Sequence, residues 1–378
     1  GNGGTSGALG TGNVKVEPSA TIEFNRSDAL LHVVGELRGG GTVIQAGTGT
    51  TTLDTASTGN TLTFIMADGS LVSGTDNAIN TTGTAYFGAA VGSTTVGSLD
   101  LTNGSTILGG LVVRTNSTAA NQLIIGAGKT LTINGTVTIG ADLNNSDVAL
   151  TATGGGDLVV NSSGGNFQIG GASGNNEGRA VVNLSGLTNF TANLGAGIFR
   201  LGDDNTGTGD NTSSLTLATN NTITAGSIEI GDGAGGAFQH TLNLGAGTNV
   251  LNADIVNIGS AVNRRRSGGL VFFAGPTGTV DIRASDGVGR ALINVVNTTT
   301  SDTATIVSVV SLNDHTANIL GGAVTMAARS ANTGGAVAIM EFNQGTLDFL
   351  TLNMASRTGA GTGDATATLT LGDSGMVP

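Results

Sequence analysis

Aspartate residues recur after glycine at the ends of short apolar segments, and carboxylates in this arrangement could bind a metal ion. Asp203, Asp232 and Asp373 each follow such a glycine directly, and Asp142 lies one residue further on. If the segments stack, these side chains would form a column of the oxygen ligands that Ca²⁺ takes. An aspartate after glycine also caps a turn through its own side chain. Because Ser260 interrupts the column and no tandem calcium-binding nonapeptide is present, the sequence favours the turn role and predicts no metal site.

Three consecutive arginines, Arg264, Arg265 and Arg266, form the one basic cluster of an otherwise acidic chain. Guanidinium groups suit carboxylates because their planar fork donates two parallel hydrogen bonds, so the cluster could contact an acidic patch on a neighbouring subunit. A solvated loop explains the same residues equally well. The sequence therefore identifies Arg264, Arg265 and Arg266 as a candidate subunit contact, with the loop as the alternative.

Residues for nucleophilic or acid–base catalysis are scattered. The three histidines, His32, His240 and His315, lie far apart without a shared motif, which gives little support to a histidine base or metal centre. The segment "GDSG" at 372–375 resembles the nucleophile segment of serine proteases, but a chain so rich in Gly, Asp and Ser produces it by chance. We expect no catalytic residues and no cofactor.

A polysaccharide lyase or hydrolase acting on acidic glycans is the alternative from the enzyme class. Enzymes of this kind use clustered carboxylates with Arg or Lys on one face. The candidates here are Asp203, Asp204, Asp232 and Arg200. Since the chain contains only two lysines, the sequence favours a protein that is not an enzyme.

Composition excludes several other classes. The chain has 378 residues, 65 of them glycine, no cysteine and a formal net charge of −12. Nothing resembles the basic stripe that neutralises phosphates, so a nucleic acid partner is not expected. No apolar run approaches the roughly 18 residues that span a bilayer, so we expect no membrane insertion within this segment. Although glycine is abundant, 38% hydrophobic residues indicate a buried core.

Short segments with apolar residues at alternate positions recur along the chain and predict strands. Several end in glycine after an aliphatic residue, namely Ile139, Ile169, Leu201, Ile230 and Ile258, at spacings of 30, 32, 29 and 28. A constant spacing of 20 to 50 residues indicates a repeated structural unit. The polar segments between these strands are rich in turn-forming residues, and we expect all of them at one corner.

These patterns predict an all-β fold, a right-handed parallel β-helix (β-solenoid) with coils of about 28 residues. No glycine-free window shows helical periodicity, and an antiparallel sandwich would not preserve a spacing near 28. We expect a single continuous β-solenoid over residues 1–378, with regular coils at 66–275 and less regular ones at 276–378. Between 276 and 341 the sequence predicts strands but no register.

The first 65 residues contain "GTSGALGTGNVKVEPSATIEFNRSDAL" followed by "GELRGGGTVIQAGTGTTTLDTAST". This resembles the autotransporter-associated β-strand repeat of large bacterial surface and secreted proteins. The resemblance covers about a sixth of the chain, and "TLTLGD" at 368–373 resembles the looser repeats that accompany it. It implies a right-handed parallel β-helix exposed outside the cell as a stalk, adhesin or matrix component. The chain ends in "GDSGMVP" and shows no set of barrel-forming strands, so the export route stays open.

The expected function is therefore that of an extracellular structural and adhesive protein of a bacterial surface. We expect it to associate with itself into a filament or stalk, since the unpaired ends of a β-helix invite another chain. Surface glycans are the other expected partners.

Two further structural expectations concern single segments. Residues 1–13 are polar enough for a flexible arm or a donated strand. Asn220, Asn221 and Asn249 could form an internal amide ladder.

Overall fold

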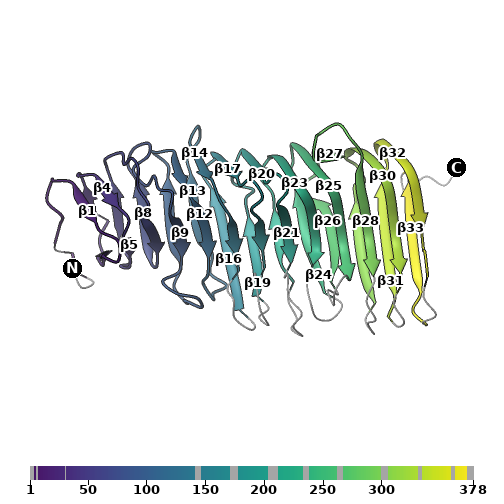
Figure 1. Cartoon of the computed structure of the whole chain (residues 1–378), viewed down its shortest axis with the longest axis horizontal. Helices are drawn as coiled ribbons and strands as arrows, with labels where there is room; N and C mark the ends of the chain where they lie inside the picture. The colour runs from purple at the N-terminus through teal and green to yellow at the C-terminus, as the bar shows by residue number, and fades with distance from the viewer. Residues whose placement is uncertain are drawn as a thin grey trace.

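The computed structural model describes residues 4–5, 7–29, 31–140, 146–170, 178–202, 212–232, 238–261, 267–298, 305–330, 334–358 and 362–372. These ranges contain 33 β-strands and no helix. Every pairing between the strands is parallel, and the strands stack into an elongated β-solenoid with its termini at opposite ends (Figure 1). The prediction of an all-β parallel solenoid is confirmed.

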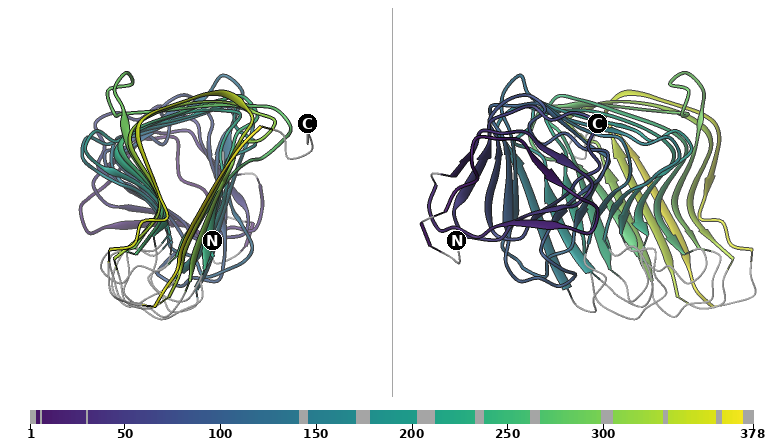
Figure 2. Two further views of the ribbon diagram at one scale, coloured as in Figure 1. Left: turned by 90° about the vertical axis from the view of Figure 1, so that its right-hand side faces the viewer. Right: turned by 60° about the vertical axis from the view of Figure 1, so that its left-hand side comes forward.

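Each coil of the chain turns around three faces, which gives the cross-section seen in the left view of Figure 2. Face A is one 13-stranded sheet, and faces B and C are two ladders of one 18-stranded sheet. Face A contains β3 (Leu31–Val33), β6 (Thr50–Leu53), β8 (Gly69–Ser73), β10 (Gly97–Leu101), β13 (Asn121–Ile125), β16 (Ser146–Thr153), β19 (Gly178–Asn183), β22 (Ser214–Thr216), β24 (Gln239–Leu244), β26 (Gly268–Phe273), β29 (Ile306–Ser311), β31 (Ala336–Phe342) and β33 (Ala365–Leu371).

Faces B and C become continuous toward the C-terminal end, where single long strands bend from one face to the other. Face B contains β11 (Thr106–Leu108), β14 (Thr130–Ile133), β17 (Asp157–Asn161), β20 (Asn189–Asn193) and β27 (Thr279–Arg283). Face C contains β2 (Thr21–Phe24), β5 (Thr42–Gln45), β7 (Thr63–Met66), β9 (Thr84–Phe87), β12 (Gly110–Val113), β15 (Val137–Ile139), β18 (Phe167–Ile169), β21 (Ile198–Gly202) and β28 (Ala291–Thr298). The strands shared by both faces are β23 (Asn220–Asp232), β25 (Thr248–Ala261), β30 (Thr316–Arg329) and β32 (Gln344–Met354). A separate pair, β1 (Val14–Val16) and β4 (Leu37–Gly39), lies at the N-terminal end.

The register of face C matches the spacing in the sequence. Ile139 pairs with Ile169, and Ile169 pairs with Leu201. Leu201 pairs in turn with Ile230, and Ile230 with Ile258. All five side chains are buried, because period-two alternation directs every second residue into the interior. These residues form a continuous aliphatic column, and the repeated unit predicted from their spacing is confirmed.

Coil length varies along the chain around the predicted value. Ile223 pairs with Leu251, as their spacing in the sequence predicts. Near the N-terminus Leu31 already pairs with Thr51, so the first coils are shorter. Val271 pairs with Leu242 on the preceding coil but with Val310 on the next, and most of this longer coil lies in the region where the sequence predicted no register.

Glycine ends these strands because the backbone there is left-handed and crowded. At Gly231 φ is +82°, and a Cβ atom would lie 2.3 Å from the carbonyl oxygen of Gly268 on face A. At Gly259 φ is +73°, and a Cβ atom would lie 2.0 Å from the hydroxyl of Ser308. Glycine adopts this backbone without strain, which explains why it recurs here, although Val296, Ala327 and Ala355 adopt a positive φ at the same corner of later coils.

Two of the three asparagines predicted to form an amide ladder do so in the interior. Asn221 Nδ2 donates to Asn249 Oδ1 at 2.8 Å, and both side chains are buried. Asn220 instead lies on the outer side, where its Nδ2 is 3.4 Å from Asn189 Oδ1. Neighbouring residues of one strand point to opposite faces, so Asn220 and Asn221 cannot share a ladder. The prediction is confirmed for Asn221 and Asn249 and wrong for Asn220.

Candidate interaction site at the open C-terminal end

The last coil of the described chain, β32 and β33, forms an open edge. β32 pairs with β30 alone and β33 with β31 alone. One side of each strand therefore presents backbone N–H and C=O groups without a neighbouring described strand. Unpaired edges of this kind are templates for another strand.

Columns of core residues end in side chains that solvent reaches. Ile293 and Val324 are buried, but their partner in the last coil, Leu352, is 39% exposed. Leu371, which pairs with Phe342, is 66% exposed. Leu352 and Leu371 are apolar because they continue the interior columns. They are exposed because no described coil lies beyond them. In the described part of the chain, these side chains continue the columns of the hydrophobic core.

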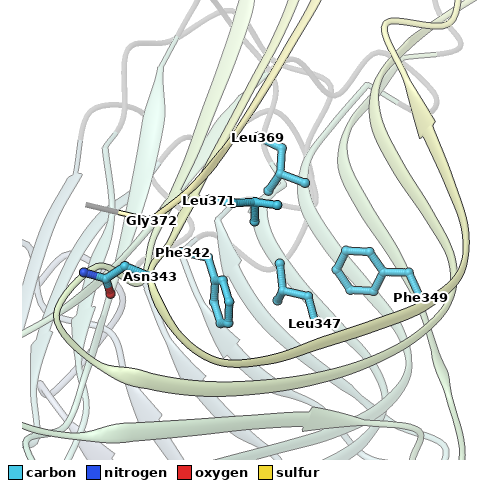
Figure 3. A pocket seen from close by; sticks show the side chains of 7 residues that line it. All are labelled: Phe342, Asn343, Leu347, Phe349, Leu369, Leu371 and Gly372. Atoms are coloured by element: carbon cyan, nitrogen blue, oxygen red, sulfur yellow. The ribbon is translucent and has the colours of Figure 1, made fainter. Parts of the chain in front are cut away.

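A hollow of about 360 Å³ opens between β31, β32 and β33. Its apolar lining comes from Phe342, Leu347, Phe349, Leu369 and Leu371, whose side chains converge across the end of the solenoid (Figure 3). Aliphatic and aromatic side chains that surround such a hollow favour apolar contact rather than binding of a polar solute.

The open edge carries almost no charge. Asp348 is the one charged residue of β32, and β33 has none. Arg290 donates to both oxygens of Asp348, at 3.0 and 2.8 Å. This hydrogen bonding holds the pKa of Asp348 below its usual range. The exposed edge therefore lacks the unpaired charges that commonly keep sheet edges apart.

At the N-terminal end β1, β2 and β3 also pair on one side only, but their interior side chains are buried. Leu9 packs against the core, and the interior residues of the first coil, Val16, Phe24 and Leu31, are at most 5% exposed. Arg26 secures this covering segment, since its guanidinium donates to the carbonyl oxygens of Thr5, at 2.6 Å, and of Gly7. Residues 7–13 form no strand and are exposed except for Leu9, and the flexible arm or donated strand expected for residues 1–13 stays a prediction.

Arg26 is held in place by Asp28, the last residue of "FNRSD". Nε and one terminal nitrogen donate to the two carboxylate oxygens at 2.8 and 2.5 Å. The hydrogen bond lowers the pKa of Asp28 and raises that of Arg26, so the pair stays charged at neutral pH.

Replacing Arg26 by lysine should loosen the N-terminal cover while leaving later coils intact. An ammonium group cannot reach the carboxylate and both carbonyl groups together, so we expect amide hydrogen exchange across residues 7–16 to rise by roughly tenfold or more. Hydrogen exchange read by mass spectrometry checks this result. Arg38→Lys is the matched control because Arg38 is exposed on the next coil. Equal protection of 7–16 in both variants would contradict the role of Arg26.

Several residues predicted to form sites lie outside the described residues. These are Asp142, Asp203, Asp204, Arg264, Arg265, Arg266 and Asp373. Asp232 ends β23, opposite Gly202, and its side chain is not described. The strands before and after the polar segments stack at one junction of faces C and A, as the right view of Figure 2 shows. The candidate subunit contact of Arg264, Arg265 and Arg266 stays a prediction.

Arg200, a candidate of the enzyme alternative, is a buried part of face C. Its Nε donates to Glu229 Oε2 at 2.8 Å, and its side chain is 6% exposed. Ser227 Oγ donates to the other oxygen of Glu229 at 3.1 Å. An arginine engaged in this way holds two coils together, which is a structural role.

The three histidines occupy separate places, as the sequence predicts. His32 lies 2.9 Å from Asp54 on the outer side of face A, and His315 stacks on Phe273 with ring centroids 3.8 Å apart. His240 is buried inside face A, where its Nδ1 accepts a hydrogen bond from the backbone N–H of Ser213 at 3.1 Å. Because Nδ1 accepts this hydrogen bond, it carries no proton, so the ring is neutral and its proton lies on Nε2.

His240 should make the protein less stable in mild acid. Burial lowers its pKa from 6.5 to about 4, so the unfolded chain binds a proton that the folded chain does not. The contribution of the neutral His240 ring to the free energy of unfolding is fully present above pH 6.5 and is lost as pH falls toward 4. We expect the free energy of unfolding to fall by about 2 kcal/mol between pH 7.5 and pH 5. Urea unfolding at both pH values measures it. His240→Gln keeps an acceptor for Ser213 and should remove most of the difference; an unchanged difference in this variant would contradict the assignment.

The residues of the open end were not singled out from the sequence. Alternation in "FLTLNM" at 349–354 and "TLTLGD" at 368–373 marks core positions, and a search for uncharged strands would have found both. Whether a coil has a neighbour on both sides depends on how the coils stack in three dimensions. The periodicity of the sequence does not give this information.

Two searches of the described ranges give no further site. They contain no group of three or more His, Cys, Asp or Glu residues arranged to hold a metal ion. Among the same residues there is no helix of the length and hydropathy needed to cross a bilayer. Comparison of the chain with family models, with curated proteins and with solved structures finds no match.

Proposed function

We propose that this chain is a structural and adhesive protein of a bacterial surface, an extracellular β-solenoid that acts as a stiff stalk. The observation that carries the proposal is the continuity of its core. One cluster of buried side chains extends from Val16 in β1 to Met340 in β31, without a break between domains. A rod of this kind resists bending because every coil is hydrogen-bonded to the next along three faces.

The outer surface supports the same role. Amide side chains link consecutive coils, for example Asn193 Nδ2 to Asn161 Oδ1 at 3.0 Å and Asn294 Nδ2 to Asn257 Oδ1 at 2.8 Å. Such rungs add lateral bonds between coils at many levels of the rod. Polar segments at the junction of faces C and A would present hydrogen-bonding groups to surface glycans.

The resemblance to autotransporter-associated repeats supports the location. "FNRSD" lies in and after β2, and "TVIQ" forms β5 on the next coil, with Ile22 paired to Val43. Arg26 and Asp28 of that motif form the bidentate pair described above. Motif residues therefore have structural roles in a short coil, as expected for a repeat of surface proteins.

Small-angle scattering and electron microscopy of the purified chain test the proposal. A stalk gives a long particle with one cross-section over its length, and incubation with acidic polysaccharides releases no unsaturated or reducing sugars. A compact particle would overturn the structural role. Sugar release abolished by Arg200→Lys would favour the lyase or hydrolase, for which the buried Arg200–Glu229 pair offers no support.

A further inference from the structure

The outer side of face A carries an apolar patch on three neighbouring coils. In β26, β29 and β31 alternate residues point away from the core, and most of these outward residues are aliphatic or aromatic. Their side chains are partly exposed, whereas the residues between them are buried. We call this set the face A patch; it consists of Leu270, Phe272, Val307, Val309, Val337 and Ile339.

The register of face A joins these residues into one continuous surface. Leu270 pairs with Val309, and Val309 pairs with Ile339 on the following coil. Val307 pairs with Val337 beside them. Described strands lie on both sides of the patch, since β24 precedes it and β33 follows it along the rod (Figure 1). The patch therefore belongs to the side of the solenoid and does not depend on where the described coils end.

Uncharged polar residues surround the patch. On β24 the outward residues include Thr241 and Asn243, and on β33 the central one is Thr368. Among the outward residues of β24, β26, β29, β31 and β33, Glu341 is the one with a charge, and its carboxylate accepts a hydrogen bond from Ser311 Oγ at 2.6 Å. An apolar centre within a polar rim is the usual arrangement of a protein–protein interface.

The charge of the chain favours a second copy as the partner. Two chains of net charge −12 repel one another, and the repulsion is weakest where the facing surfaces carry no charge. The other two faces have charged side chains on their outer sides, such as Asp281 and Arg283 on face B and Glu229 on face C. Face A of a second copy presents the same uncharged, apolar surface, so the two patches complement each other under twofold symmetry.

The area of the patch and its rim is sufficient for a specific pair. The five strands from β24 to β33 are six or seven residues long. With about 4.8 Å between strands and about 3.3 Å per residue, they cover about 500 Å² on each copy. The pair would bury about 1,000 Å², which is the lower limit for a specific interface, so we expect a dissociation constant in the micromolar range.

We propose that two copies of this chain associate side by side through the outer side of face A, with the face A patch at the centre of the interface. The inference rests on the structural role proposed above and deepens it, because pairing two rods along their sides makes a stiffer stalk than one rod alone. Burial of the six apolar side chains supplies the affinity, and the polar rim remains in contact with water.

Sedimentation equilibrium of the full chain over a range of concentrations tests this inference. The wild type should pass from one chain to two in the micromolar range, and Leu270→Glu should raise the dissociation constant by roughly a hundredfold, because it places two carboxylates in an apolar interface. Val309→Lys should weaken the pair similarly although it lowers the net negative charge, which separates apolar contact from overall repulsion. Val159→Glu is the matched control, since Val159 is a partly exposed outward valine of face B and its variant should still pair.

The substituted residues lie outside the core, so all three variants should keep the circular dichroism of the wild type. A monomeric wild type, a pair unaffected by Leu270→Glu, or a pair strengthened by Val309→Lys would each overturn the proposal. Vesicles of phosphatidylcholine test a lipid surface as the occupant of the patch. Sedimentation of the wild type with these vesicles that Leu270→Glu abolishes would also overturn it.

Spin labels give an independent measurement, which the absence of cysteine makes simple. A label at Thr241→Cys, beside the patch, should show a clearly shorter distance to its copy than a label at Thr191→Cys on the outer side of face B. The reverse order would place the interface on another face and contradict the proposal. A monomer that is still rod-shaped in small-angle scattering leaves the structural role intact, so the two failures are distinguishable.

Discussion

Replacing Asn249 by alanine should lower the free energy of unfolding by about 3–5 kcal/mol, because it leaves several buried polar groups without partners. Asn249 Oδ1 accepts from Asn221 Nδ2 and from the N–H of Gly245, both at 2.8 Å. Its Nδ2 donates to the carbonyl oxygens of Gly245 and Thr279, both at 2.9 Å. One side chain thus joins three consecutive coils in a dry interior. Chemical denaturation of the wild type and the variant measures the loss.

Two further variants separate hydrogen bonding from packing at this position. Asn249→Asp keeps the shape but places a carboxylate oxygen against the carbonyl groups of Gly245 and Thr279, so it should be at least as destabilising as alanine. Asn220→Ala removes a half-exposed amide of the outer side and should cost at most about 1 kcal/mol. Equal losses for Asn249→Ala and Asn220→Ala would show that the interior ladder has no special role.

The asparagines show how far sequence reasoning reaches. Spacing alone aligns Ile223 with Leu251, because interior columns repeat the same residue type at a fixed interval. The position of Asn249 in the interior follows from the same register. The ladder prediction is wrong for Asn220 because it rests on composition, whereas the period of two places Asn220 and Asn221 on opposite sides of the strand.

Other features of the fold depend on contacts that no local pattern contains. The coil that starts at Leu31 is short and the coil that starts at Val271 is long, because the turns between their strands differ in length. Turn sequences show little periodicity, so these lengths cannot be predicted from the pattern. The cover held by Arg26 requires a side chain to reach the carbonyl group of Thr5, which belongs to a segment before the first strand. An open end is a property of the whole stack. The alternation of the strands was therefore predictable, and the structure of the two ends was not.

The stack of three phenylalanines should be the most sensitive apolar position of the core. Phe167 and Phe199 occupy paired positions on neighbouring coils with ring centroids 5.0 Å apart, and Phe190 lies 5.4 Å from Phe167. All three are fully buried, and the rings fill the space between faces B and C at this level of the rod. Aromatic pairs at these distances add attraction beyond the burial of area.

Phe199→Ala should therefore lower the free energy of unfolding by about 3–5 kcal/mol, since the cavity cannot close between coils fixed by hydrogen bonds on both sides. The same substitution at Phe272, a half-buried ring on the outer side of face A, should cost about 1 kcal/mol because neighbouring side chains and water replace it. Denaturation curves of both variants give the comparison. If Phe272→Ala proved as costly as Phe199→Ala, the stability of the rod would come from its faces and not from its core. The larger loss at Phe199 is expected because parallel coils bury their side chains on one side only, so each interior ring supports the coil above and the coil below at once.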